Sequence, residues 1–251
     1  MDERQRHYLG VMGIQVWEQR AAVPAGEQGE GNKEQGTRLQ EEKPGNLEPC
    51  TLNLVPENDV AALDWPLLRE RVAECRSCEE LAASRTQTVF GVGNPNADWL
   101  VIGEAPGAEE DRQGEPFVGR AGQLLNAMLA AVGLARERVY IANVLKCRPP
   151  NNRDPKAEEA AACRGFLQRQ IALIQPRLIL VVGRIAAQNL LDTDAPLGTL
   201  RGKVHRLESG VPVVVTYHPA YLLRSPQEKR KAWADLCLAR ATVQDAAEQA
   251  R

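Results

Sequence analysis

Four cysteines of this 251-residue chain have the spacing of a metal site. Cys75 and Cys78 form a Cys-x-x-Cys pair, and Cys147 and Cys163 lie far downstream with fifteen residues between them. Two adjacent and two distant thiolates can converge on zinc or on an iron–sulfur cluster, and spacing does not separate these two. A redox dithiol and ordinary buried thiols are the alternatives.

The stretch 103–107 reads Gly-Glu-Ala-Pro-Gly, a proline-stiffened turn that can bring backbone N–H groups against a flat or anionic ligand. The acidic run 109–111 follows. Paired carboxylates could do acid–base chemistry, but we interpret this run as a solvated loop. Phe117, one of only three phenylalanines, lies in a Gly/Pro-rich loop. It is either a loop anchor or a stacking surface for a nucleobase.

Three polar residues follow apolar runs. Asn143 offers an amide acceptor and donor side by side, which match the N3–H and O4 of uracil. Asn152, in a loop after Cys147, is either a turn residue or a ligand. His218 is either a core histidine or part of a site, because the following Tyr-Leu-Leu-Arg run ends at Arg224. An apolar wedge beside a basic residue is typical of base-flipping proteins.

From residue 63 onward, the pattern alternates between strand and helix. Strands are predicted over 97–102, 139–145, 178–182 and 211–216, and helices over 119–132, 154–175, 184–191 and 227–247. Asp154-Pro155 is interpreted as the start of the second of these helices. Near-continuous apolar strands indicate a parallel sheet covered on both faces. The polar motifs follow three strands, so we expect them to meet at the carboxyl edge of the sheet.

Composition divides the chain into three parts. Residues 1–60 carry 11 acidic and 6 basic side chains, whereas 61–251 carry 22 and 25, so the net charges are −5 and +3. We expect a short apolar-basic peptide over 1–20, a disordered linker over 21–60 and one globular domain over 61–251. The mildly basic domain permits contact with phosphates. No apolar stretch resembles a membrane span or a signal peptide, so we expect a cytoplasmic, nucleoid-associated protein.

Together these motifs resemble the iron–sulfur uracil-DNA glycosylases, family 4 of the uracil-DNA glycosylase superfamily. The resemblance covers about residues 75–240 and rests on the stretches 103–107, 116–125, 140–153 and 218–224. It implies hydrolysis of uracil from DNA at the start of base excision repair. It also implies a three-layer α/β/α fold with a central four-stranded parallel sheet. A [4Fe–4S] cluster on the four cysteines would staple the N-terminal part of the domain to this sheet.

The same resemblance implies a role for each motif residue. Substrate binding falls to Gly103, Ala105, Gly107, Phe117 and Asn143; catalysis to His218, Asn152 and Glu104; and DNA intercalation or contact to Leu222, Leu223 and Arg224. Ala105 stands where a better-known branch of the superfamily has an aspartate that orients water. The mechanism is therefore expected to depend on stabilising the leaving uracil. Asn152 is the first candidate for positioning the water, and Glu104 is the second.

Two other functions are compatible with these residues. One is a non-catalytic iron–sulfur protein that binds DNA and senses uracil, which Ala105 keeps open. The other is an electron-transfer module, which the three pocket motifs disfavour. Residues 4–20 either dock on their own domain or bind a partner, and they resemble the N-terminal peptide of the bacterial clamp-loader psi subunit. That resemblance implies a contact with the replication clamp loader. We expect a monomer with no membrane contact.

Overall fold

The computed structural model describes residues 10, 12 and 60–249. The peptide predicted over 1–20 and the linker predicted over 21–60 therefore lie outside the described residues, except for Gly10, Met12 and Val60. None of the helices in the described part is long and apolar enough to cross a membrane.

A single mixed sheet forms the centre of the domain. Its strands are β1 (Val92–Gly93), β2 (Trp99–Gly103), β3 (Tyr140–Asn143), β4 (Leu178–Val182), β5 (Val204–Arg206) and β6 (Pro212–Thr216). Their order is β1-β3-β2-β4-β6-β5. The four central strands are parallel, and each edge strand is antiparallel to its neighbour. The four predicted strands form the parallel centre of the sheet, and the prediction missed both edge strands, whose two or three residues include no buried side chain.

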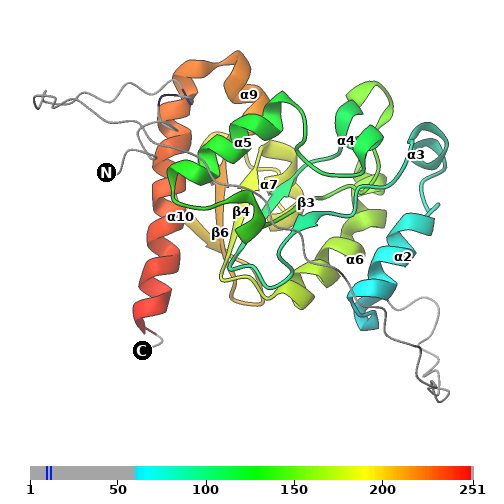
Figure 1. Cartoon of the computed structure of the whole chain (residues 1–251), viewed down its shortest axis with the longest axis horizontal. Coiled ribbons are helices and arrows are strands. Elements are labelled where there is room, and N and C mark those ends of the chain that lie inside the picture. Colours follow the sequence, from blue (N-terminus) through cyan, green and yellow to red (C-terminus); the bar gives the residue numbers. More distant parts are fainter. Residues whose placement is uncertain (1–9, 11, 13–59, 250–251) are drawn as a thin grey trace, which may run out of the picture.

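Helices cover both faces of this sheet. In the described part they are α2 (Trp65–Glu74), α3 (Glu79–Ser84), α4 (Ala108–Gln113), α5 (Arg120–Ala131), α6 (Ala157–Ile174), α7 (Arg184–Leu191), α8 (Leu197–Leu200), α9 (Pro219–Arg224) and α10 (Lys229–Gln249). Helices α5, α9 and α10 pack on one face, and α6, α7 and α8 pack on the other (Figure 1). The three-layer α/β/α arrangement follows.

Strand β2 shows why the central strands are apolar throughout. Trp99 and Val101 belong to the hydrophobic cluster on the α5/α10 side, whereas Leu100 and Ile102 belong to the cluster on the α6/α7 side. Successive side chains of a strand point to opposite faces. Because both faces are covered here, all five residues of β2 are buried.

A third hydrophobic cluster attaches α2 and α3 to the end of the sheet. Leu68 and Val72 of α2 and Leu81 of α3 are fully buried in it, together with Phe90. Trp65 adds edge-to-face contacts with the rings of Phe90 and Tyr140, at centroid distances of 5.3 and 5.2 Å. This cluster includes the four cysteines of the predicted metal site.

Helix α6 (Ala157–Ile174) begins two residues later than predicted, since Asp154 was expected to be its N-cap. Its N-cap is Lys156, whose backbone N–H donates to Glu159 Oε2 at 2.9 Å. Asp154, the predicted cap, instead pairs with Arg184 at 3.3 Å.

Met12 is the one described residue of the N-terminal segment with a buried side chain. It is 0% exposed and belongs to the hydrophobic cluster on the α5/α10 face.

Candidate functional site

The predicted site residues meet in a cleft of 470 Å³ at the carboxyl edge of the sheet. From β2 the chain continues to β3 on one side, and from β4 it continues to β6 on the other. Ligands bind where strand connections diverge in this way. The predicted residues that line the cleft are Glu104, Ala105, Gly107, Phe117, Asn143, Asn152, His218 and Arg224, and Glu110, Arg153 and Tyr221 join them.

Gly103 lets the cleft form without lining it. It pairs with Asn143 in the parallel register of β2 and β3. A Cβ atom at Gly103 would lie 2.4 Å from Asn143 Oδ1 and 2.7 Å from two ring carbons of Phe117. Only glycine allows these two side chains to approach the backbone so closely.

Asn143 combines a fixed backbone with an unpaired side-chain acceptor. Its side chain is buried, and Oδ1 has no hydrogen-bond partner among the described residues. Lys146 Nζ donates to the Asn143 carbonyl at 2.8 Å and to Gln170 Oε1 at 2.7 Å. An unpaired buried acceptor costs about 1–3 kcal/mol, so such an atom is a strong indication of a ligand site.

Phe117 is held in a strained backbone conformation. Its φ is 54°, unusual for a bulky residue, and its ring is 6% exposed. Arg136 donates to the carbonyls of Pro116 at 2.6 Å and Phe117 at 3.3 Å. Glu110 Oε1 accepts from the next two backbone N–H groups at 3.0 and 3.2 Å. These bonds hold the loop and place the Phe117 ring in the wall of the cleft.

The solvated-loop interpretation of 109–111 was wrong for two of its three carboxylates. Glu110 lines the cleft and supports the Phe117 loop, whereas Asp111 is buried and accepts from Thr86 N at 2.9 and 3.0 Å. Only Glu109 is exposed, beside Arg112. The run forms helix α4, and a helical turn sends adjacent carboxylates to different sides. The amino-acid composition of this run does not indicate which of its carboxylates is buried and which is exposed.

His218 presents a neutral imidazole with a defined tautomer. It caps α9, and its Nδ1 accepts from Ala220 N at 3.1 Å, which places the ring proton on Nε2. Burial and, to a smaller extent, the Arg224 charge lower the pKa of His218 to about 4, while the Glu110 charge opposes this shift. The ring lies 5.5 Å from the Phe117 ring, at 31°. A neutral N–H donor therefore stands beside the aromatic wall.

Glu104 and Asn152 contribute the other polar groups. Burial raises the pKa of Glu104 to about 7; the charge of Asp154 adds to this shift, and Arg184 opposes it. Arg148 Nε donates to Asn152 Oδ1 at 2.8 Å, which orients the Asn152 carboxamide. At neutral pH Glu104 can therefore both accept and release a proton.

The predicted wedge is only partly on the surface. Leu222 is fully buried in the core beneath α9, so it is not exposed to a base stack in this structure, and its assignment to DNA contact stays a prediction. On a helix, adjacent residues face different directions. Tyr221 and Leu223 are 36% and 37% exposed, and Arg224 lines the cleft, so these three form the surface of the wedge.

The four cysteines gather in the third hydrophobic cluster. Cys147 and Cys163 are buried, and Cys75 and Cys78 are partly buried. Burial raises the pKa of Cys78, and the charges of Cys147 and Cys75 raise it further, so these sulfurs are close enough to interact. Arg85 Nη1 donates to Cys147 Sγ at 2.7 Å. Among the described residues, no group of three or more His, Cys, Asp or Glu is arranged to hold a metal ion.

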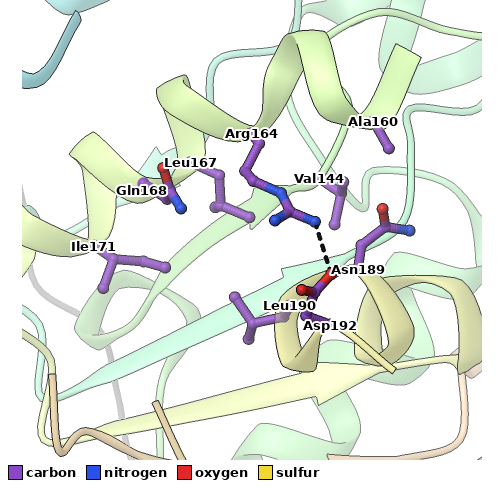
Figure 2. Close-up of a pocket in the computed structure, with 9 residues that line it drawn as sticks. All are labelled: Val144, Ala160, Arg164, Leu167, Gln168, Ile171, Asn189, Leu190 and Asp192. Atoms are coloured by element: carbon purple, nitrogen blue, oxygen red, sulfur yellow. Dashed lines mark hydrogen bonds and ion pairs between the residues drawn. The ribbon is translucent and has the colours of Figure 1, made fainter. Parts of the chain in front are cut away.

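A second cavity, between α6 and α7, lacks catalytic groups. It has a volume of 70 Å³ and an apolar floor, and Arg164 and Asp192 pair across it at 3.2 Å (Figure 2). Binding sites for small molecules usually have volumes of about 300–1,000 Å³. The 470 Å³ cleft is therefore the better candidate site.

Several known proteins are similar to this chain in amino-acid sequence. The family described as the uracil DNA glycosylase superfamily matches residues 90–238. A type-4 uracil-DNA glycosylase of Archaeoglobus fulgidus is 48% identical in a match that covers 67% of this chain and 87% of that protein. One from Thermotoga maritima is 46% identical, over 63% of this chain and 83% of that protein.

A type-5 uracil-DNA glycosylase of Thermus thermophilus is less similar, at 31% identity over 51% of this chain and 73% of that protein. The chain belongs to the uracil-DNA glycosylase superfamily and, within it, to the type-4 family.

Gly122 provides a test of the Phe117 loop. Gly→Ala inside a helix usually stabilises by about 1 kcal/mol. At Gly122 of α5 a Cβ would lie 1.8 Å from the Phe117 carbonyl oxygen, so we expect Gly122→Ala to destabilise the protein and lower its melting temperature. Gly198→Ala in α8, where a Cβ meets nothing within 4 Å, is the matched control and should be neutral or stabilising. Equal effects of the two changes would contradict this account.

Proposed function

We propose that this protein flips uracil out of DNA and hydrolyses its N-glycosidic bond. The observation that carries the proposal is the buried Asn143 carboxamide, whose Oδ1 lacks a partner among the described residues. A uracil in the cleft supplies the missing donor, because its N3–H can bond to Oδ1 while O4 accepts from Nδ2. Type-4 relatives at 41–48% identity support the same activity.

Recognition of uracil combines hydrogen bonds from Asn143 to the edge of the base with stacking of Phe117 on its face. The Phe117 ring closes one side of the cleft, and aromatic stacking on a base contributes about 1–3 kcal/mol. Stacking accepts any base, so discrimination falls to Asn143. Cytosine presents an acceptor at N3 and a donor at N4, the reverse of uracil, and would face Oδ1 with a lone pair.

Bond cleavage depends on stabilising the departing uracil. As the C1′–N1 bond breaks, its electron pair passes to the uracil ring, and the sugar becomes oxocarbenium-like. Negative charge then develops on O2, where the His218 Nε2–H can donate. Because the pKa of His218 is about 4, the imidazole is neutral and stabilises the anion as a hydrogen-bond donor.

Water completes the hydrolysis. Ala105 supplies no carboxylate, so another group must accept the proton of the attacking water. The structure favours Glu104 over Asn152, reversing the order expected from the sequence. A carboxyl with a pKa of about 7 is well matched to a general base at neutral pH, whereas an amide cannot take a proton. We assign Asn152 to orienting the water or the sugar.

The reaction stops at the abasic site. A lyase step requires an amine nucleophile that forms a Schiff base with the sugar. None of the described residues that line the cleft is a lysine. We therefore propose a monofunctional glycosylase. Tyr221 and Leu223 are the candidates for filling the gap left by the flipped base, with Arg224 beside them.

The four cysteines fit an iron–sulfur cluster. Arg85 and the Lys146 backbone N–H donate toward the Cys147 and Cys163 sulfurs, and such bonds are typical around cluster thiolates. The thiolates of a [4Fe–4S] cluster bind different irons and so stand wider apart than the ligands of one ion. We propose that Cys75, Cys78, Cys147 and Cys163 hold this cluster. Its role here is to staple the α2–α3 segment to the β3 loop and α6.

The N-terminal peptide stays a separate proposal. Binding of residues 4–20 to a replication clamp loader would require Met12 to leave the hydrophobic cluster that it occupies. The buried Met12 therefore makes such a contact compete with docking on the chain's own domain. We propose a monomer that contacts uracil-containing DNA. A non-catalytic uracil sensor is not favoured, because the relatives are named as glycosylases.

The first prediction concerns excision itself. Purified protein should release uracil from a uracil-containing oligonucleotide, measured as strand cleavage after alkali. Loss of the O2 donor in His218→Ala should lower the rate by about 10²–10³.

Asn143→Asp should extend excision to cytosine, since a carboxylate accepts from N4. Asn151→Asp, outside the cleft lining, is the control. An unchanged rate in His218→Ala would refute its assignment.

The second prediction is a pH dependence. The base form of Glu104 is the carboxylate, so single-turnover excision should rise about tenfold per pH unit below pH 7 and level off above it. His218 is already neutral above about pH 5 and should add no further step. Glu104→Gln should be slow and independent of pH between 5 and 8. A rise near pH 7 that persists in Glu104→Gln would remove Glu104 as the base.

The third prediction concerns the cofactor. The protein should contain about four irons and absorb visible light as iron–sulfur proteins do. Cys163→Ser should lose iron and unfold at a lower temperature, because one tie between α6 and the cluster is removed. Cys237→Ser, at an exposed thiol on α10, should keep both properties. Zinc in place of iron, or full iron content in Cys163→Ser, would overturn the assignment.

A further inference from the structure

A second polar hollow of 480 Å³ lies beside the uracil cleft and carries three arginines. Arg69 comes from α2, Arg76 from the turn between α2 and α3, and Arg85 from the end of α3. The residues that line this hollow include no aspartate or glutamate. A concave surface with only positive charge attracts anions.

The short helix α4 separates the hollow from the cleft. Glu110 of α4 lines the cleft, whereas Asp111 accepts from Thr86 N at 2.9 Å on the side of the arginines. Gln87 Nε2, beside Thr86, donates to the carbonyl of Arg112 at 3.0 Å, again from the hollow. Figure 1 shows α4 between α5 and α3. The two hollows are thus about one helix thickness apart, on the order of 10–12 Å.

Arg69 and Arg76 are not paired with a carboxylate of the described residues, whereas Arg85 is held against the Cys147 sulfur. The Arg69 guanidinium lies over the Phe90 ring, 4.7 Å from its centroid, which leaves its N–H edge available. Arg85 donates to Cys147 Sγ and to the Cys75 carbonyl, at 2.7 and 2.6 Å. Arg76 makes no hydrogen bond or ion pair with any described residue. None of the three pairs with a carboxylate within the described ranges.

The spacing matches a DNA strand. Phosphates follow one another at about 3.4 Å per nucleotide along the axis, so 10–12 Å corresponds to about three nucleotides. We propose that Arg69 and Arg76 bind a backbone phosphate about three nucleotides from the flipped uracil, on one flank. The proposal rests on the proposed function, because it needs uracil-containing DNA in the cleft. An acidic peptide is disfavoured, because the neighbouring cleft already orients a polyanion.

The test measures the affinity for DNA against salt concentration. The probe is a duplex with one 2′-fluoro-2′-deoxyuridine, whose electron-withdrawing fluorine destabilises the oxocarbenium-like sugar and should therefore slow cleavage enough for binding to be measured. Each lost phosphate contact should reduce the slope of log K against log[salt] by about 0.9, so Arg69→Gln with Arg76→Gln should reduce it by about 1.8. The dissociation constant of the double variant should rise about tenfold. Arg177→Gln, at the amino end of β4, is the matched control and should leave both values unchanged.

Flank length locates the phosphate. Shortening one flank of the probe below about three nucleotides should weaken wild-type binding, while the double variant should be insensitive to the same truncation. Since Arg76 lies between Cys75 and Cys78, iron content is measured in each variant. Arg69→Gln, on α2, provides a test that does not depend on the cysteines.

The outcomes separate this proposal from the proposed function. Failure of the wild type to release uracil would refute the glycosylase. Normal single-turnover excision, with an unchanged salt slope in Arg69→Gln and in the double variant, would overturn the phosphate site. Binding of an acidic peptide that the double variant loses, with DNA affinity unchanged, would equally overturn it. Normal saturating excision with a reduced slope is the expected result.

Discussion

The close approach of Asn143 and Phe117 to the Cα of Gly103 is the constraint on which the rest of the site depends. The parallel register of β2 and β3 places Asn143 directly beside Gly103, and the Phe117 ring closes over both. A Cβ at this point would collide with Asn143 Oδ1 and with the Phe117 ring, and would separate the amide that we propose selects the base from the ring that we propose stacks on it. Because glycine has no Cβ, the side chains of Asn143 and Phe117 can both line the same cleft.

The Phe117 loop shows how strain is kept where a ligand needs it. Its positive φ is disfavoured for an aromatic residue, and the surrounding bonds hold it in place. Arg136 and Glu110 grip the backbone from two sides, and Gly122 leaves room for the carbonyl. The Glu110 carboxylate and the Arg136 guanidinium thus fix the backbone of this loop. The Phe117 ring, which we propose stacks on the base, is therefore already in place in the wall of the cleft.

Burial also sets the chemistry of the polar groups. The same low-polarity surroundings make His218 a neutral donor and give Glu104 a pKa near 7. These protonation states suit the roles proposed for the two groups, a hydrogen-bond donor to the departing uracil and a base toward the attacking water. The cysteine cluster lies apart from these groups, yet it shares the β3 loop with them, since Lys146 joins Asn143 to Gln170 next to Cys147. Folding of the cysteine segment and alignment of the base-reading edge are therefore linked.

By itself, the sequence determined the central apolar strands and the helices between them. The predicted ranges 178–182 and 184–191 match β4 and α7, because uninterrupted apolar runs and helical periodicity are local properties. The motifs following the strands also identified most of the cleft residues. The edge strands β1 and β5 were not predicted, because two or three half-exposed residues are too few to show an alternating hydrophobic pattern.

Only the tertiary structure decided the assignments that depend on direction. Leu222 and Leu223 are chemically alike, and the turn of α9 alone sends one into the core and the other to the surface. Glu110 and Asp111 separate in the same way, to opposite sides of α4. Which charges surround Glu104 likewise depends on Asp154 and Arg184, which come from distant parts of the chain. Residue types set which chemistry is possible, and packing sets which side chain faces the ligand, because orientation arises from contacts far apart in sequence.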